Sequence, residues 1–443
     1  MRKRILKTRT FIILAVITSL FVQGMSADAA ELNVPPKGFK ALFNGKNLSG
    51  WYGWSTKNPE DLWSMSADDQ AAYKKKSLED VNQHWSVQDG ILVNDGHGLY
   101  LTSEEEFSNF ELLIDYKTVP KADSGIYLKA VPQVQIWDYT EETKFGIGAD
   151  KGSGGLWNNS KGAKGKDPLV RADKPFGEWN SFRIRQIGSR TWVWMNGKLL
   201  VDNAIMENYF DRSRPLFPQG PIQLQTHGGE ISWRNVFVRE ISPDEATDIL
   251  SESADDKGFV SIFNGKDLSG WQGATASYDV VDGAIQCRKG TGGNLFTEKE
   301  YSDFVVRLEI KTPPAGNNGL AIRYPGKGNP AFDGMTELQV LDVEYPGKLA
   351  PYQFHGSAYS MVAAHRGYLY PAGHWNYQEV TVVGSKIKVE LNGSVILDCD
   401  LADVTDEAKI KQHPGKDLKS GFFGFAGHND PVQFRNITIK ELK

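Results

Sequence analysis

One long segment of this sequence returns 220 positions later. Gly38-Phe-Lys-Ala-Leu-Phe-Asn-Gly-Lys-Asn-Leu-Ser-Gly-Trp51 reappears as Gly258-Phe-Val-Ser-Ile-Phe-Asn-Gly-Lys-Asp-Leu-Ser-Gly-Trp271. Further matches follow in the same order: Asp89-Gly90 with Asp282-Gly283, Gln135-Ile-Trp-Asp138 with Gln339-Val-Leu-Asp342, and Trp233-Arg-Asn235 with Phe434-Arg-Asn436. A period near 200 residues is too long for the unit of a solenoid or propeller. The repeat therefore predicts two whole domains of one fold.

The length agrees with this division, because 443 residues are more than one hydrophobic core usually organises. We place the first domain at 31–241, a linker at 242–257 and the second domain at 258–443. The acidic linker, which begins Ser242-Pro-Asp-Glu, is compatible with a short helix. Linkers of this kind usually pack loosely, so we expect 242–257 to make few contacts across the boundary.

Residues 1–30 have the pattern of a secretory signal peptide. Basic residues precede an apolar run from Phe11 to Val22, and the small-residue site Ala27-Asp28-Ala29 follows. The run is too short to span a membrane, so we predict export to the periplasm or secretion without membrane insertion. Removing five basic residues and one acid changes the formal charge from −5 to −9. Such an acidic surface argues against nucleic acid as a partner, and the sequence carries no signal for an oligomeric state.

Along both copies the dominant hydrophobic period is two. Phe110, Leu112, Ile114 and Tyr116 alternate with less apolar residues, and the second copy repeats the pattern from Phe304. In each copy an Asn-Gly pair, at 196–197 and 392–393, separates two alternating runs, which is a strong hairpin signal. Many short strands and little helical periodicity predict an all-β chain, with an antiparallel jelly-roll sandwich in each domain.

Two departures from the repeat concern helix and cysteine. The offset between the copies falls from 220 at Trp51 to 193 at Gly90, so the first copy carries 27 extra residues, in which 66–83 could form a helix. The only cysteines are Cys287 and Cys399, both in the second copy. In an oxidising compartment they could form a disulfide, but the sequence cannot place them within bonding reach, and we favour two buried free thiols.

Candidate binding residues in the first copy lie on the polar faces of two strands. Alternation places Gln133, Gln135 and Trp137 on one face, and Gln223, Gln225 and His227 on another. Amides, an indole and an imidazole suit carbohydrate, because amides bind hydroxyl groups and an indole stacks on a sugar ring. A solvated sheet face is the alternative, although it would more usually carry Thr, Lys and Glu.

Tryptophan differs between the copies. Trp51 and Trp271 occupy matched positions, as do Trp179 and Trp375, and we therefore assign these four to the core. Trp137 and Trp157 have no counterpart in the second copy, which makes them the better ligand candidates.

The second copy replaces most of the amide face. Gly424, Ala426 and His428 stand where the first copy has Gln223, Gln225 and His227. A second site would therefore consist of Glu337, Gln339, Asp342, Arg323 and His428, and it should prefer another ligand. His355, His365 and His374 lack the spacing of a preformed metal site, so we predict no metal and no other cofactor.

Taken together, these motifs resemble the 3-keto-disaccharide hydrolase family, once per copy. The resemblance rests on the Phe-Asn-Gly-Lys-Asn/Asp-Leu-Ser-Gly-Trp segment, Asp123-Ser-Gly125, the Gln135 and Gln339 segments, Gly-Glu/His-Trp-Asn and the closing Arg-Asn strand. It implies two concanavalin A-like jelly-roll β-sandwich domains in tandem. It also implies cleavage of glycosides that are already oxidised to a ketone at carbon 3.

The chemistry implied by the resemblance needs one base, donors for an enolate oxygen and an acid for the leaving group. We assign Asp138 or His227 as base or acid, Gln135 and Gln223 as donors, and Trp137 as a platform. Asp342 and His428 are the corresponding candidates in the second copy, which departs from the family pattern at Gly424-Phe-Ala-Gly-His428. A lectin-like protein that holds glycan without cleaving it is the alternative, since jelly rolls perform both tasks.

Overall fold

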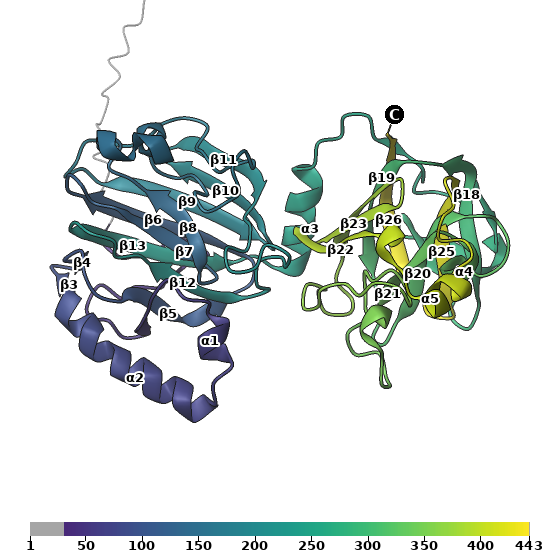
Figure 1. The fold of residues 1–443 in the computed structure, drawn as a ribbon, viewed down its shortest axis with the longest axis horizontal. Coiled ribbons are helices and arrows are strands. Elements are labelled where there is room, and N and C mark those ends of the chain that lie inside the picture. The colour runs from purple at the N-terminus through teal and green to yellow at the C-terminus, as the bar shows by residue number, and fades with distance from the viewer. Residues whose placement is uncertain (1–30, 443) are drawn as a thin grey trace, which may run out of the picture.

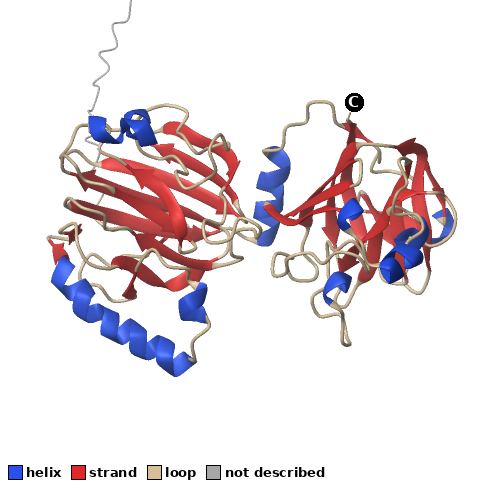
Figure 2. Cartoon of the chain, viewed as in Figure 1, coloured by secondary structure: helices blue, strands red, loops and turns tan. Residues whose placement is uncertain are grey.

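The computed structural model describes residues 31–442 as two β-sandwiches joined by a helix (Figure 1). The segment in which we predict the signal peptide lies outside the described residues. Each domain contains one eight-stranded and one five-stranded antiparallel sheet, and no sheet is shared between the domains. Strands dominate both halves, whereas helices lie at the edges and between the domains (Figure 2). The prediction of two separate sandwiches is thus confirmed.

In the first domain the large sheet has the order β11-β10-β9-β6-β13-β4-β3, with β1 paired to β13, and the small sheet has the order β2-β5-β12-β7-β8. The strands are β1 (Lys40–Ala41), β2 (Trp51–Trp54), β3 (Trp85–Gln88), β4 (Ile91–Asn94), β5 (Tyr100–Phe107), β6 (Phe110–Thr118), β7 (Ser124–Leu128), β8 (Val131–Ile136), β9 (Asn180–Ile187), β10 (Arg190–Met195), β11 (Lys198–Ile205), β12 (Gly220–Leu224) and β13 (Ile231–Glu240).

The second domain repeats this order, with β16-β17-β26-β19-β22-β23-β24 and β14 in the large sheet and β15-β18-β25-β20-β21 in the small one. The strands are β14 (Val260–Ser261), β15 (Trp271–Gly273), β16 (Tyr278–Val281), β17 (Ala284–Cys287), β18 (Gly292–Tyr301), β19 (Phe304–Lys311), β20 (Asn317–Tyr324), β21 (Thr336–Leu341), β22 (Asn376–Val383), β23 (Lys386–Leu391), β24 (Ser394–Asp400), β25 (Gly421–His428) and β26 (Gln433–Glu441).

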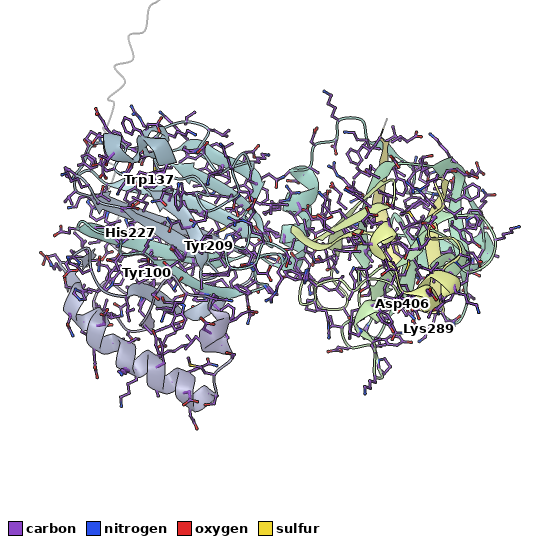
Figure 3. All side chains as sticks on the ribbon, in the orientation of Figure 1. Tyr100, Trp137, Tyr209, His227, Lys289 and Asp406 are labelled. Atoms are coloured by element: carbon purple, nitrogen blue, oxygen red, sulfur yellow. The ribbon has the colours of Figure 1, made fainter. Side chains whose placement is uncertain are left out.

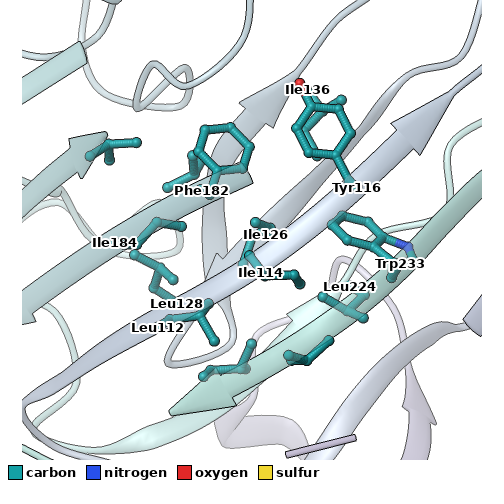
Figure 4. Close-up of a cluster of buried hydrophobic side chains, with 14 of the residues drawn as sticks. Leu112, Ile114, Tyr116, Ile126, Leu128, Ile136, Phe182, Ile184, Leu224 and Trp233 are labelled. Atoms are coloured by element: carbon teal, nitrogen blue, oxygen red, sulfur yellow. The ribbon is translucent and has the colours of Figure 1, made fainter. Parts of the chain in front are cut away.

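The core of each domain lies between its two sheets. Leu112, Ile114 and Tyr116 of β6 point toward Ile126 of β7 and Leu224 of β12, and all five are buried (Figure 4). This is the face that the period of two assigned to the interior. Only one face of the small sheet packs into the core, so its other face can carry polar residues.

Local signals placed the turns and the inserted helix correctly. Asn196 and Asn392 adopt positive φ angles of 50° and 49°, as the Asn-Gly hairpins between β10 and β11 and between β23 and β24 require. The inserted helix α2 (Ala67–His84) starts at Ser66, whose hydroxyl accepts the amide of Asp69. The other helices are α1 (Glu60–Trp63), α3 (Pro243–Glu252), α4 (Pro330–Asp333), α5 (Glu407–Gln412) and the 3₁₀ helices η1 (Glu142–Ile147), η2 (Ala149–Lys151), η3 (Thr275–Ser277), η4 (Pro351–Gln353) and η5 (Leu401–Asp403).

The expected loose linker is wrong. Helix α3 buries Ala246 and Leu250 against Trp192 of the first domain and Tyr377 of the second. Arg190 adds a direct ion pair to Glu390, with 2.6 Å between Nη2 and Oε2, and Glu390 is nearly fully buried. The composition of 242–257 did not predict this packing, because α3 has few apolar residues. Their partners, Trp192 and Tyr377, lie far away in the sequence, one in each domain.

A further expectation, on two of the matched tryptophans, needs correction. Trp179 and Trp375 are half-buried at the surface rather than in the core, each under an arginine, with Arg234 4.1 Å and Arg435 4.1 Å from the ring centroids. Trp51 and Trp271 are core residues as predicted.

The two cysteines do not form a disulfide. Cys287 on β17 and Cys399 on β24 are free thiols. Strands β26, β19, β22 and β23 lie between them in the sheet, so their separation is roughly 24 Å at about 4.8 Å per strand, far beyond bonding reach. Within residues 31–442 no helix is both long and apolar enough to cross a membrane.

Candidate functional site

The predicted amide face exists on the small sheet of the first domain. Register places Gln135 opposite Gly125 and Gln223 opposite Tyr127. Gln133 and Gln135 of β8 therefore share a face with Gln223 of β12 and with Gln225, which directly follows this strand. Val134 and Ile136 point the other way, into the core. A Cβ atom at Gly125 would lie 2.9 Å from Gln133 and 3.0 Å from Gln225, so the absence of a side chain lets the amides meet there.

The amides are buried, and their donors are used within the face. Gln223 Nε2 donates to Thr102 Oγ1 at 3.0 Å, and Gln225 Nε2 lies 3.5 Å from the hydroxyl oxygens of Tyr100 and Tyr127. The Oε1 atoms of Gln133, Gln223 and Gln225 have no hydrogen-bond partner. Neighbouring acceptors of this kind are suited to receive hydroxyl groups, which a sugar offers in quantity.

A charged cluster lies at the end of this face. His227, just beyond β12, has its Nδ1 3.2 Å from Asp123 Oδ2, and Lys144 Nζ lies 3.2 Å from the same oxygen. Gln135 Nε2 donates to Asp123 Oδ1 at 2.8 Å. The carboxylate is therefore held by three donors, with 8% of its side chain exposed, whereas 61% of the His227 side chain is exposed. An accessible imidazole backed by a fixed carboxylate is an arrangement for proton transfer.

The cluster alters the titration of its members. The Asp123 hydrogen bond and charge raise the pKa of His227 above 6.5, although partial burial and Lys144 act in the opposite direction. Burial acts to lower the pKa of Lys144, but Asp123 and Glu141 raise it overall. His227 thus keeps its proton to a higher pH than an ordinary histidine does, and Lys144 keeps its positive charge to a higher pH than an ordinary lysine does.

Asp138, which we assigned as base or acid, accepts hydrogen bonds from the loops on both sides of it. Its Oδ2 accepts the amide of Lys121 at 2.7 Å, and its Oδ1 accepts the amide and hydroxyl of Thr140 at 2.7 and 2.6 Å. Burial acts to raise the pKa of Asp138, but these hydrogen bonds from Thr140 and Lys121 hold it below its usual value. Asp138 therefore fixes the loops beside the site, and Asp123 is the carboxylate that meets His227.

Trp137 and Trp157 lie beside the cluster. Their rings meet edge to face with centroids 5.8 Å apart, and Lys144 Nζ is 6.0 Å from the Trp137 centroid. Trp137 is 6% exposed, so it forms a wall rather than an open platform. Figure 3 labels Trp137, His227 and Tyr100 on the side of the first domain that carries the small sheet.

Sequence reasoning missed several members of the site. Asp123 appeared only as part of the Asp123-Ser-Gly125 motif, where an acid directly before a polar strand was the available signal. Lys144 lies in the short helix η1 and carried no signal. The hydroxyl groups of Tyr100 and Tyr127 lie 2.7 and 3.1 Å from the hydroxyl oxygen of Thr56. Both tyrosines lie on the amide face because of the strand register, which the sequence does not predict.

The second domain has the same frame and a different face. Trp51 pairs with Ser103 and Trp271 with Thr297, so the registers of the two small sheets superpose and Gly424, Ala426 and His428 do replace Gln223, Gln225 and His227. Glu337 replaces Gln133, and its Oε1 lies 3.8 Å from His428 Nε2. Glu337 raises the pKa of His428 against the effect of burial.

Two other second-domain candidates serve the fold. Asp342 Oδ2 accepts the amide of Ala315 at 2.8 Å, as Asp138 does with Lys121. Arg323 is 1% exposed and donates to the carbonyl oxygens of Ser302, Gly384 and Leu418. The structure therefore does not bring Arg323 together with Gln339, whose Nε2 donates to Asn317 Oδ1 at 2.7 Å.

His355, His365 and His374 of the second domain lie apart. His355 is buried between the amide of Leu341 and the side chain of Gln378, His365 contacts the carbonyl of Ser213, and His374 pairs with Asp244. Among residues 31–442, no group of three His, Cys, Asp or Glu side chains could hold a metal ion.

Comparison with known families agrees with the repeat. Residues 38–239 and 258–440 each match the family described as the 3-keto-alpha-glucoside-1,2-lyase-like domain. The chain belongs to this family. A 3-keto-disaccharide hydrolase of Bacteroides thetaiotaomicron is 28% identical over 238 residues, which are 44% of this chain and 82% of that protein.

Solved structures similar to single copies include two from Parabacteroides distasonis, both described as candidate glycosyl hydrolases. One is 26% identical with a TM-score of 0.38, covering 42% of this chain and 95% of its own. The other is 24% identical with a TM-score of 0.36, covering 42% and 99%.

Proposed function

We propose that the first domain cleaves 3-keto-glycosides. The family and the name of the Bacteroides relative point to a glycosidase of the 3-keto-disaccharide hydrolase type. The observation that carries the proposal is the Asp123, His227 and Lys144 cluster at the end of a buried amide face. Ordinary glycoside hydrolysis would instead call for two carboxyl groups on opposite sides of the bond.

In the proposed reaction the ketone at carbon 3 acidifies the proton on carbon 2. Neutral His227 removes this proton, and Asp123 stabilises the imidazolium that forms. The electron pair moves into a double bond between carbons 1 and 2 as the aglycone leaves carbon 1, taking a proton from the imidazolium. Water then adds its hydroxyl to carbon 1 and a proton to carbon 2, which gives the free 3-keto-sugar.

The other residues bind and orient the sugar. The free Oε1 atoms of Gln133, Gln223 and Gln225 accept its hydroxyl groups. Lys144 is the cation closest to the pair and stabilises negative charge on the carbon 3 oxygen. Gln135, whose amide is committed to Asp123, positions that carboxylate instead of donating to the enolate as we had assigned.

The test is incubation of the protein with a 3-keto-disaccharide and, separately, with its unoxidised parent. We expect free 3-keto-sugar from the first only, with solvent deuterium incorporated at carbon 2. Saturable binding of both compounds without turnover would leave the lectin-like function in its place.

We also propose that the protein acts outside the cytoplasm, on the basis of the basic and apolar pattern of residues 1–30. N-terminal sequencing of protein collected from the periplasm or medium should begin at Ala30. Intact residues 1–30 on that protein would contradict cleavage.

A further inference from the structure

The two domains keep the imidazole of the site but exchange the position of its carboxylate. In the first domain the acid is Asp123, in the loop before β7, and the strand position on β8 holds Gln133. In the second domain the position that corresponds to Asp123 is the first residue of β20 and holds Asn317, and the strand position on β21 holds the acid Glu337. Each domain thus has one acid and one amide at these two places, in opposite order.

The Glu337 side chain lies directly over the backbone of Gly319 on the neighbouring strand. A Cβ atom at Gly319 would lie 2.1 Å from Glu337 Oε1, so only glycine leaves room for the carboxylate over the sheet. Gly319 pairs with Gln339 as Gly125 pairs with Gln135, so Glu337 stands at the strand position that Gln133 holds in the first domain.

The Glu337 carboxylate has fewer hydrogen-bond and ion-pair partners than the Asp123 carboxylate of the first domain. Asp123 receives three donors, whereas within residues 31–442 His428, at 3.8 Å, is the only charged or hydrogen-bonding side chain recorded beside the Glu337 carboxylate. A separation of 3.8 Å exceeds a hydrogen bond, so neither group must break one to meet a substrate. His428 is 48% exposed and Glu337 5%, which gives an accessible imidazole above a sheltered acid.

We propose that the second domain is a second catalytic site for 3-keto-glycosides, in which Glu337 is the base and His428 the acid. This inference rests on the function proposed for the first domain. Glu337 takes the proton from carbon 2, the electron pair forms the double bond between carbons 1 and 2, and the aglycone leaves carbon 1 with a proton from His428. Water returns its hydroxyl to carbon 1, the Glu337 proton returns to carbon 2, and His428 is reprotonated from solvent.

The reversed roles give the two sites opposite pH dependence. The first site needs neutral His227, which faces Asp123 and Lys144, so its rate rises as pH increases through the pKa of His227. The second needs protonated His428, which faces Glu337 and Asp430, so its rate falls as pH increases through the pKa of His428. The second site also offers fewer groups to sugar hydroxyls, because Gly424 and Ala426 replace two glutamines, and it should show a higher KM.

The test uses substitutions that each domain already contains at the same place. Asp123→Asn introduces the residue found at 317, and Glu337→Gln introduces the residue found at 133, so both variants should fold. We measure turnover of a 3-keto-disaccharide between pH 6 and 9 for each full-length variant and for the double variant. Asp123→Asn should leave a residual activity that falls as pH rises, and adding Glu337→Gln should lower it by at least about tenfold.

The outcomes separate the two proposals. If wild-type protein is active but Glu337→Gln changes neither the rate nor the pH profile in the Asp123→Asn background, the second site is refuted and the first stands. If wild-type protein turns over no 3-keto-glycoside at all, the proposed function and this inference both fail.

Discussion

Asp138 in the first domain and Asp342 in the second occupy the same place and hold the same loop, but only Asp138 has both oxygens satisfied. Thr140 donates twice to Asp138, whereas Glu344 stands at the corresponding position in the second domain and Asp342 Oδ1 has no partner. The amide bond to the preceding loop is kept in both domains, at Lys121 and Ala315. The contact that recurs in both copies is the one that maintains the strand connection.

The faces of the small sheets have changed much more than this frame. A buried basic side chain at the end of β7 or β20 donates to a turn carbonyl in both domains: Lys129 donates to Gly188 and Arg323 to Gly384. On the same sheets, glutamine has become glycine, alanine or glutamate. The residues that recur in both domains hold strands and turns together, whereas the residues that differ lie on the polar faces of the small sheets.

The largest effect on stability that we expect comes from replacing Asp138 or Asp342, the two aspartates that accept loop amides. Asp138→Ala removes three hydrogen bonds to a buried carboxylate and should lower the free energy of unfolding by about 3 kcal/mol or more, while Asp342→Ala removes one and should cost about 1.5 kcal/mol. Urea unfolding followed by circular dichroism measures both. Equal losses would mean that the Thr140 bonds contribute nothing and that the two caps are equivalent.

A smaller effect, on rate, should follow from moving the acid within the first domain. Asp123→Asn with Gln133→Glu reproduces the arrangement of the second domain on the frame of the first. In a Glu337→Gln background, the double change should recover at least about tenfold more turnover than Asp123→Asn alone. The recovered activity should fall with rising pH, since glutamate now acts as the base.

Gln133→Glu alone is the matched control for this transplant. It places two acids near Gly125, where their repulsion should reduce turnover. A transplant that is no better than Asp123→Asn would show that the position of the carboxylate is fixed by features other than Asp123 and Gln133.

Much of the frame was predictable because its signals are local. Alternation along β6, the Asn196-Gly197 turn and the Ser66 cap each involve residues within a few positions of one another. Asp123 and His227 are brought together by the pairing of β7 with β12. Neither segment contains a local signal that predicts this pairing. The surface position of Trp179 was not predicted for the same reason, because Arg234, which covers its ring, lies on the distant strand β13.

The smallest effect concerns stability against pH. The pKa of His227 is raised in the folded domain, so its pairing with Asp123 stabilises the fold fully below about pH 6.5, and this contribution disappears as pH rises through the folded pKa. The free energy of unfolding of Asp123→Asn should therefore lie below that of wild type at pH 6, and the difference should become smaller as pH rises to 9. Lys144, which also loses a partner in this variant, stays charged throughout this range because its pKa is raised from 10.5, and so it adds a constant offset.

Glu337→Gln should show the same sign with a smaller slope, because its imidazole is 3.8 Å away rather than 3.2 Å. Tryptophan fluorescence during urea unfolding reports mainly on the first domain, which holds ten of the twelve tryptophans, and circular dichroism reports on both. A deficit for Asp123→Asn that widens with pH would reverse the inferred direction of the His227 shift and remove the reason for giving this histidine the role of base.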